Sequence, residues 1–153
     1  EKGTTSMKIA MGADHGGFSL KETIKQHLEE QGHEVLDLGT YDTASCHYPV
    51  YAEKVARAVA AGQAERGILV CGTGIGMSIA ANKIPGIRAA AVSDCFTAQA
   101  TREHNDANIL CLGERTVGPG LAMRIVDTYL AAQFQGGRHQ TRLDMIAALE
   151  KAR

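Results

Sequence analysis

The sequence has no tryptophan and only 5% aromatic residues, and its 16 basic and 17 acidic residues nearly balance. Proteins that bind nucleic acid usually combine a basic patch with aromatic side chains that stack on bases. Because this chain has neither feature, we expect no nucleic-acid partner. It also lacks an apolar run long enough to cross a bilayer and a recognisable secretory signal. We therefore expect no membrane partner and a cytoplasmic location.

The cysteines form no CxxC pair and have no spacing typical of metal ligands; they are Cys46, Cys71, Cys95 and Cys111. We expect reduced thiols, as in cytosolic proteins, and no zinc site. Cys95 and Cys111 fall in or beside predicted core elements. We therefore expect both to be small buried hydrophobic residues.

The length of 153 residues suffices to bury a full core without disulfides or metals. We therefore expect a single domain over residues 7–153. Residues 1–6 show no pattern and precede Met7, a plausible initiator. We expect these six residues to be a cloning remnant outside the fold.

Short apolar runs alternate with segments of helical spacing along the chain. The runs predict strands at residues 8–12, 34–38, 68–70, 87–92 and 108–112. The other segments predict helices at residues 18–31, 50–62, 77–82, 95–104, 117–132 and 141–153. A repeat of about thirty residues is typical of an α/β protein whose five-stranded parallel sheet lies between two layers of helices. Gly136 and Gly137 interrupt the last pattern, so we expect the final helix to extend from the body, where it can pack on a neighbour.

The segment from Gly67 to Asn82 is central to the chemistry. It joins a buried strand, Cys71, three alternating glycines and a helix. Backbone N–H groups of such a turn, together with the start of a helix, form an anion site. The same partial charge stabilises a neighbouring thiolate. The sequence therefore predicts a base or nucleophile beside a place that holds negative charge.

Two known phosphate-binding motifs do not match this turn. The phosphate loop of nucleotide hydrolases needs Lys and then Ser or Thr after its last glycine, whereas Gly76 is followed by Met77 and Ser78. The dinucleotide fingerprint needs two residues between its last glycines, and here only Ile75 intervenes. Asp94 lies where a ribose-binding acid would, which keeps a dinucleotide site open as an alternative. A further alternative is that the glycines serve only a tight turn.

Polar residues follow most of the predicted strands, and ligands bind at the carboxyl ends of strands in such sheets. The residues at these ends are Asp14, His15, Cys71, Ser93, Asp94, Glu114 and Arg115. His104 and Asn105 instead close a helix that points away from these ends. They would therefore serve the same site only through a neighbouring subunit, which indicates a dimer.

The residues allow two reaction classes. Cys71 could attack an acyl or phosphoryl group with help from a histidine, or it could remove a proton next to a carbonyl while the turn stabilises an enediolate. The alternative for Cys71 is a buried thiol without a role. Arg138 and Arg142, four residues apart on one helix face, suit a phosphate dianion, the alternative being a solvated helix end. His139 is predicted to be solvated or to cap a helix.

Four motifs in collinear order resemble those of the type B ribose-5-phosphate isomerases; they are residues 13–17, 71–76, 102–108 and 136–142. Sister enzymes isomerise galactose 6-phosphate or allose 6-phosphate. The resemblance implies a Rossmann-like fold and dimers or tetramers with sites shared between subunits. It also implies no metal and no organic cofactor.

Residue roles follow from the same resemblance. Cys71 matches the base that moves a proton between C1 and C2 of the sugar through an enediolate, and His104, beside Asn105, matches the group that opens the sugar ring. Family members with serine at the position of Cys71 use a glutamate at the position of Ile75 or Gly76. This chain has the cysteine and no such glutamate, so it resembles the thiol type. The resemblance implies that the sugar is contacted by Asp14, His15 and Tyr48. The enediolate would be bound by the turn residues Gly72, Thr73, Gly74, Ile75 and Gly76. The phosphate would be bound by Arg115, Arg138 and Arg142.

The resemblance implies an isomerase of the pentose phosphate pathway that interconverts ribose 5-phosphate and ribulose 5-phosphate. An isomerase of hexose 6-phosphates is an alternative, because the two substrate classes differ by one carbon. A phosphosugar-binding module without catalysis is another, although Cys71 would have no evident purpose in it.

Overall fold

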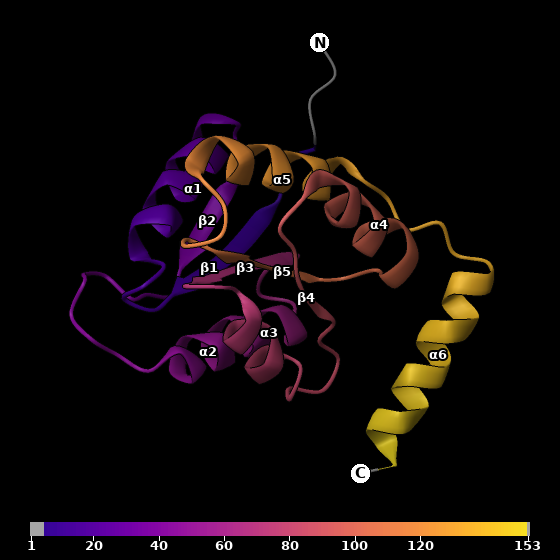
Figure 1. Cartoon of the computed structure of the whole chain (residues 1–153). Coiled ribbons are helices and arrows are strands. Elements are labelled where there is room, and N and C mark those ends of the chain that lie inside the picture. Colours follow the sequence, from indigo (N-terminus) through magenta and orange to yellow (C-terminus); the bar gives the residue numbers. More distant parts are fainter. Residues whose placement is uncertain (1–4, 153) are drawn as a thin grey trace.

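Within residues 5–152, which the computed structural model describes, five strands form one parallel sheet in the order β2-β1-β3-β5-β4 (Figure 1). The strands are β1 (Lys8–Ala13), β2 (Glu34–Asp37), β3 (Arg66–Cys71), β4 (Ala89–Ala91) and β5 (Ile109–Gly113). Each neighbouring pair is parallel, which confirms the predicted sheet. The predicted remnant, residues 1–6, lies mostly outside the described residues.

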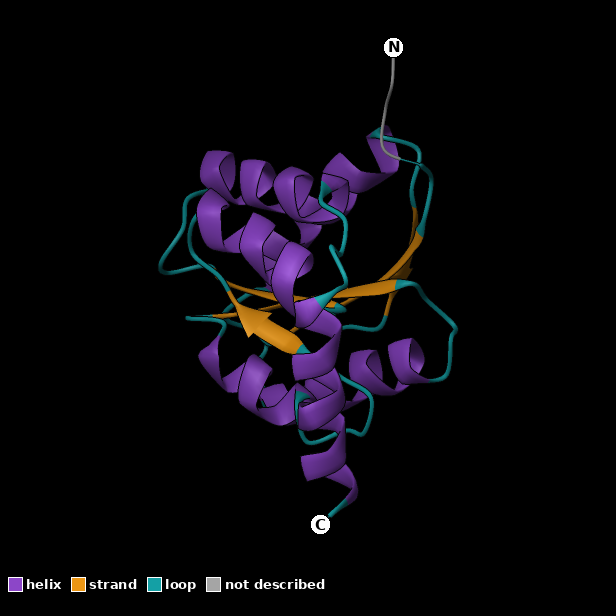
Figure 2. Cartoon of the chain, turned by 90° about the vertical axis from the view of Figure 1, so that its right-hand side faces the viewer, coloured by secondary structure: helices purple, strands orange, loops and turns teal. Residues whose placement is uncertain are grey.

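Helices cover both faces of the sheet (Figures 1 and 2). One layer consists of α1 (Phe18–Glu30), α4 (Cys95–Asn105) and α5 (Pro119–Ala131), and the other of α2 (Tyr48–Ala60) and α3 (Ile75–Ala81). Alternate side chains of β3 supply the two cores, because successive residues of a strand point to opposite faces. Ile68 and Val70 pack in the core of the first layer, and Leu69 and Cys71 in that of the second. The predicted three-layer α/β architecture is confirmed.

The last helix, α6 (Arg138–Lys151), stands beside the body next to α4 (Figure 1). It follows Gly136 and Gly137, whose φ angles of 68° and 58° are readily adopted by glycine. Among the described residues of α6, only His139 and Leu143 are buried. The helix therefore extends from the body with most of its surface uncovered.

Three helices begin earlier than predicted. α2 begins at Tyr48 because Pro49, which has no N–H to satisfy, fits its first turn, so the preceding loop ends at His47. α3 begins at Ile75, so Ile75 and Gly76 belong to the helix rather than to the turn. α6 begins at Arg138 rather than at residue 141.

The prediction for two cysteines is confirmed in one case. Cys111 is buried in β5, whereas Cys95 is only half-buried because it is the first residue of α4. Across residues 5–152, no helix is both long and apolar enough to cross a membrane.

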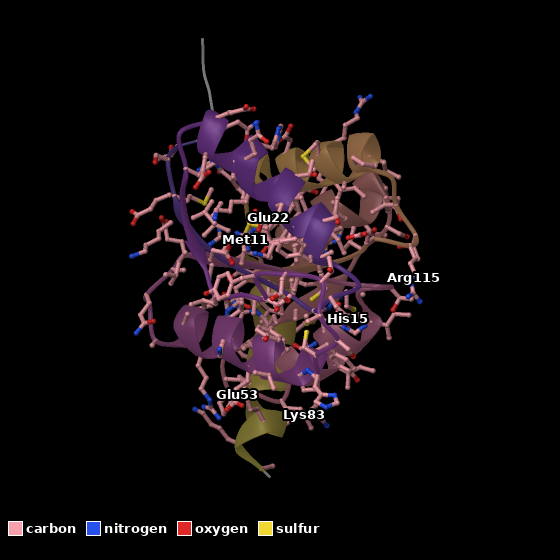
Figure 3. The ribbon with its side chains drawn as sticks, turned by 90° about the vertical axis from the view of Figure 1, so that its left-hand side faces the viewer. Met11, His15, Glu22, Glu53, Lys83 and Arg115 are labelled. Carbon is pink, nitrogen blue, oxygen red and sulfur yellow. The ribbon has the colours of Figure 1, made fainter. Side chains whose placement is uncertain are left out.

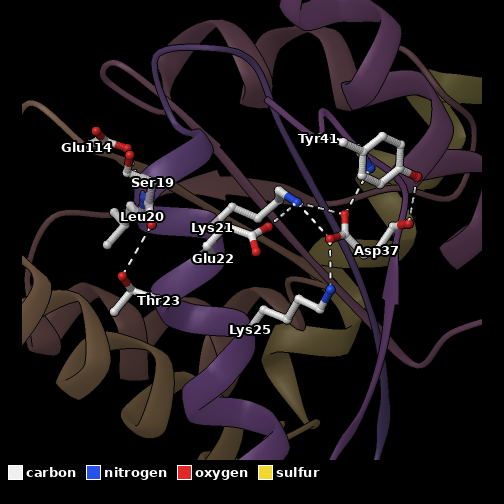
Figure 4. A network of polar contacts seen from close by, with 10 residues as sticks. Ser19, Leu20, Lys21, Glu22, Thr23, Lys25, Asp37, Tyr41 and Glu114 are labelled. Carbon is white, nitrogen blue, oxygen red and sulfur yellow. Dashed lines mark hydrogen bonds and ion pairs between the residues drawn. The ribbon is translucent and has the colours of Figure 1, made fainter. Parts of the chain in front are cut away.

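A buried ion pair fixes the loop that follows β2 (Figure 4). The Lys21 ammonium, fully buried, donates at 2.8 Å to both carboxylate oxygens of Asp37, and Lys25 donates to one of them at 3.2 Å. Burial alone would raise the pKa of Asp37, but the hydrogen bonds from Lys21, Gly39 and Lys25 outweigh it and lower the pKa. The N–H of Thr40 then donates to the carbonyl of Ala13 at 2.8 Å. The loop is thereby held over the end of β1.

Candidate active site

The carboxyl ends of β1 and β3 lie where the topology of the sheet changes direction, since β2 and β3 flank β1 on opposite sides. Ligands bind at such points in open α/β sheets. Asp14 and His15 follow β1, Cys71 ends β3 and Arg115 comes soon after β5. His15 and Arg115 both lie on the side of the molecule that Figure 3 presents. The structure thus gathers these predicted residues at one edge of the sheet.

Cys71 is nearly buried, with 5% of its surface exposed. Its sulfur accepts a hydrogen bond from the backbone N–H of Gly74, with a donor–acceptor distance of 3.1 Å. The carbonyl of Cys71 accepts from the N–H of Glu114 at 2.9 Å, which ties the end of β3 to the residue after β5. The thiol is therefore fixed against the glycine-rich turn.

The glycines of the turn permit close packing. Gly74 has a φ of 81°, and a Cβ added there would lie 3.0 Å from the backbone of Leu112. A Cβ added to Gly113 would lie 2.6 Å from the backbone of Thr73. The alternative interpretation, glycines for a tight turn, is thus part of the explanation. Arg115 lies over the turn, with its Cδ 3.5 Å from where a Cβ of Gly72 would stand.

Tyr48 reaches the same turn from the start of α2. A Cβ added to Gly76 would lie 2.7 Å from Cζ of the Tyr48 ring, so glycine at this position makes room for the tyrosine. The ring is partly exposed, at 39%. Spacing in the sequence does not predict this contact, because the two residues come from different helices.

The turn after β1 completes this group. One carboxylate oxygen of Asp14 accepts hydrogen bonds from the N–H groups of Gly16 at 2.9 Å and Gly17 at 3.1 Å. His15 is exposed, and its Nδ1 accepts from the backbone N–H of Cys46 at 3.2 Å. The loop before α2 therefore reaches the turn after β1.

A second group lies at the end of α4 and the start of α6. His104 and Asn105 close α4, and Arg138 and Arg142 lie in the first two turns of α6; all four are exposed. The ring of His104 stacks on that of His139. Burial, followed by the charges of Arg138, His104 and Arg142, lowers the pKa of His139.

His139 corrects a prediction, because it is 7% exposed rather than solvated. The signal was present in the sequence. His139 and Leu143 are four residues apart and form the buried stripe of α6, but a helix expected to begin at residue 141 leaves His139 outside the pattern.

The two groups lie apart in the chain's own structure. α4 runs back along the sheet, so His104 and Asn105 lie toward the amino ends of the strands, whereas Cys71 ends a strand. Figure 1 shows α6 on the opposite side from the loop before α2. No hydrogen bond or ion pair joins the two groups within the described part of the chain. The predicted site residues thus form two separate groups within the described part of the chain.

No set of three or more His, Cys, Asp or Glu side chains is placed to hold a metal ion within residues 5–152. The backbone N–H of Gly74 and the side chain of Arg115 lie at the glycine-rich turn. The chain is an α/β protein of the Rossmann-like class. Its fixed cysteine and glycine-rich turn lie at the topological switch point, where ligands bind in such sheets.

Comparison with known proteins identifies the family. The family model described as Ribose/Galactose Isomerase matches residues 9–146. The chain is 54% identical over 146 residues to ribose-5-phosphate isomerase B of Escherichia coli, covering 95% of this chain and 98% of that protein. The chain belongs to the ribose/galactose isomerase family, which is a family of enzymes.

A solved structure of ribose-5-phosphate isomerase B from Clostridium thermocellum superposes with a TM-score of 0.95 at 56% identity, covering 95% of this chain and 99% of that one. The galactose-6-phosphate isomerase subunit LacB of Clostridium acetobutylicum is 43% identical over 129 residues, covering 84% of this chain and 75% of that protein.

Proposed function

We propose that the chain is an aldose–ketose isomerase that interconverts ribose 5-phosphate and ribulose 5-phosphate. The observation that carries this proposal is the position of the Cys71 sulfur, which ends β3 and accepts a hydrogen bond from Gly74 of the glycine-rich turn. Full-length similarity to ribose-5-phosphate isomerase B supports the choice of a pentose phosphate.

Cys71 acts as the base in this proposal. It removes the proton from C2 of the open-chain aldose and returns it to C1, while a hydroxyl proton moves from O2 to O1. The intermediate is a cis-enediolate, whose negative charge is stabilised by the amides of residues 72–76. A positioned base of this kind contributes about 100- to 10,000-fold to the rate. No oxidant and no cofactor enter the balance.

The remaining residues bind the substrate and prepare it. His104, beside Asn105, opens the sugar ring before the proton is removed. Asp14, His15 and Tyr48 contact the sugar near the turn. The phosphate is held by Arg115 and by the pair Arg138 and Arg142, because guanidinium forks match the geometry of a phosphate dianion.

In this proposal the Cys71 group and the His104 group are two half-sites, and a complete site needs two copies of the chain. In a homodimer, or a tetramer built from dimers, the His104 group of one copy would complete the Cys71 group of the other. Uncovered apolar surface on α6 supports such an assembly, since Met145, Ile146 and Leu149 are 52–72% exposed. Ile146 and Leu149 also line a groove of about 600 Å³ between α6 and β4. A cytoplasmic place in the pentose phosphate pathway fits this activity.

The second candidate is isomerisation of a hexose 6-phosphate. The similarity to a subunit named galactose-6-phosphate isomerase favours it. Ribose 5-phosphate and a hexose 6-phosphate have the same aldehyde end and the same phosphate, and their carbon chains differ by one carbon. The same base and arginines would therefore serve either substrate.

The deciding experiment is an isomerisation assay with ribose 5-phosphate, allose 6-phosphate and galactose 6-phosphate under identical conditions. The proposal expects the largest kcat/KM for ribose 5-phosphate. A larger value for either hexose phosphate would favour the second candidate. No turnover of any of the three would indicate a binding module and contradict both.

A further inference from the structure

The helix that carries His104 and Asn105 ends in an unusual backbone conformation. Asp106, the next residue, has φ 46° and ψ 43°. In the described part of the chain it is the only non-glycine residue with a positive φ. Helix ends of this left-handed kind usually carry glycine, which adopts the conformation without strain. The presence of aspartate rather than glycine at this helix end is therefore explained by the contacts of its side chain.

Two arginines donate hydrogen bonds to Asp106, and we call Arg88, Arg102 and Asp106 the Asp106 clamp. Nη1 of Arg102 donates to Oδ1 of Asp106 at 2.6 Å. Arg88 donates from Nη2 to Oδ2 at 3.4 Å and from Nε to the Asp106 carbonyl at 2.9 Å. Each carboxylate oxygen thus faces a different arginine. Arg102 is 4% exposed, whereas the Asp106 side chain is 34% exposed, so the contact is buried on the arginine side only.

The clamp is anchored in the body of the fold. Nη1 of Arg102 also donates to the carbonyl of Ala107 at 3.0 Å, and the hydroxyl of buried Tyr129 in α5 donates to that carbonyl at 2.6 Å. The backbone N–H of Arg88 donates to the side chain of Asn108 at 2.8 Å. The end of α4 is therefore fixed from α5 and from the segment before β4.

His104 and Asn105 lack comparable support. Both are exposed, and within residues 5–152 neither side chain makes a hydrogen bond. The ring of His104 stacks on that of His139, and Asn105 lines the groove beside α6. Their positions therefore depend on the backbone that Asp106 ends.

We infer that the Asp106 clamp positions His104 and Asn105 for ring opening, with Asp106 as its centre. This inference rests on the proposed function of His104. Asp106 does not touch the substrate in this scheme; it acts through the residues before it. A misplacement of about 1 Å in a reacting group can cost about 100-fold in rate.

The test compares two reactions of the full-length protein. Isomerisation of ribose 5-phosphate needs ring opening, whereas exchange of the C1 proton of ribulose 5-phosphate with deuterated solvent does not. Asp106→Gly removes the carboxylate but suits the left-handed turn. We expect it to lower kcat for ribose 5-phosphate about ten- to hundred-fold and to change the exchange rate less than about two-fold.

Further variants separate positioning from folding. Asp106→Asn tolerates the left-handed conformation and keeps an oxygen for Arg102, so it should restore most of the activity. Arg88→Gln removes the guanidinium that donates to Asp106 from the other side. It should lower kcat for ribose 5-phosphate by a smaller factor than Asp106→Gly does. Arg57→Gln, from the exposed Glu53–Arg57 pair, is the control and should leave both rates unchanged. Should Asp106→Gly fail to fold, the Asn and Arg88 variants decide the test.

His104→Ala distinguishes failure of the inference from failure of the proposed function. It should lose isomerisation and keep exchange, and adding Asp106→Gly should then have no further effect. If His104→Ala leaves isomerisation intact, the proposed role of His104 fails, and the inference with it. If His104→Ala shows the selective loss and the clamp variants do not, only the inference fails. Equal loss of both reactions in the clamp variants would also overturn it.

Discussion

The imidazole rings of His104 and His139 lie stacked, with their centroids 4.5 Å apart and their planes inclined by 14°. This stack joins the end of α4 to the first turn of α6. The backbone N–H of Gln135 adds a second link by donating to the carbonyl of Glu103 at 3.0 Å. The group proposed to open the ring and the arginines proposed to bind phosphate therefore belong to one connected unit.

His139 should make the folded state sensitive to pH. Because burial and its neighbours lower the pKa of His139, the unfolded chain binds a proton more readily than the folded chain. Stability should therefore fall as the pH decreases through the usual histidine pKa of about 6.5. His139→Phe keeps a ring for the stack and removes the titration. We expect its thermal unfolding midpoint to vary less between about pH 7.5 and 5.5 than that of the wild type; parallel profiles would contradict this.

Replacing Cys71 should separate catalysis from folding. Cys71→Ala removes the proposed base at a nearly buried position, and the alanine fits the space of the thiol. We expect a loss of about 100- to 10,000-fold in kcat for ribose 5-phosphate, with a circular dichroism spectrum like that of the wild type. Cys95→Ala is the matched control, since Cys95 is half-buried at the start of α4, and it should keep full activity. Near-normal turnover by Cys71→Ala would exclude the thiol as base.

The arginines of α6 should determine the preference for a phosphorylated sugar. A charge-assisted hydrogen bond contributes about 1.5–3 kcal/mol, and remote binding energy of this kind helps to drive the chemistry. The Arg138→Ala, Arg142→Ala double variant should therefore lose most of the preference for ribose 5-phosphate over free ribose. The measurement is the ratio of the two kcat/KM values, which cancels general damage. If the ratio survives, these exposed arginines belong to a solvated helix end.

The sequence predicted those features that depend on local pattern. The apolar run at residues 68–70 gave β3, and strand direction gave the common edge of Asp14, Cys71 and Arg115. The strand ends could be grouped in this way because parallel strands in one sheet share their direction.

Contacts that depend on tertiary packing could not be predicted from the sequence. The ring of Tyr48 against Gly76 depends on how α2 and α3 pack. The stack of His139 depends on where α6 begins, and helix boundaries follow weakly from propensity. The clamp on Asp106 joins residues 18 positions apart through a conformation that few residues adopt, so the motif alone did not reveal it.

Mixing two inactive variants should restore activity if each site is shared between copies. Cys71→Ala damages one half-site and His104→Ala the other, and the described chain shows no hydrogen bond or ion pair between the halves. In a mixed dimer one site then carries both substitutions and the other carries neither. Unfolding the two variants together and refolding them at equal concentration should therefore give up to about a quarter of wild-type activity. Each variant refolded alone is the control. Activity no greater than the mean of the two controls would mean that both halves of a site come from one chain.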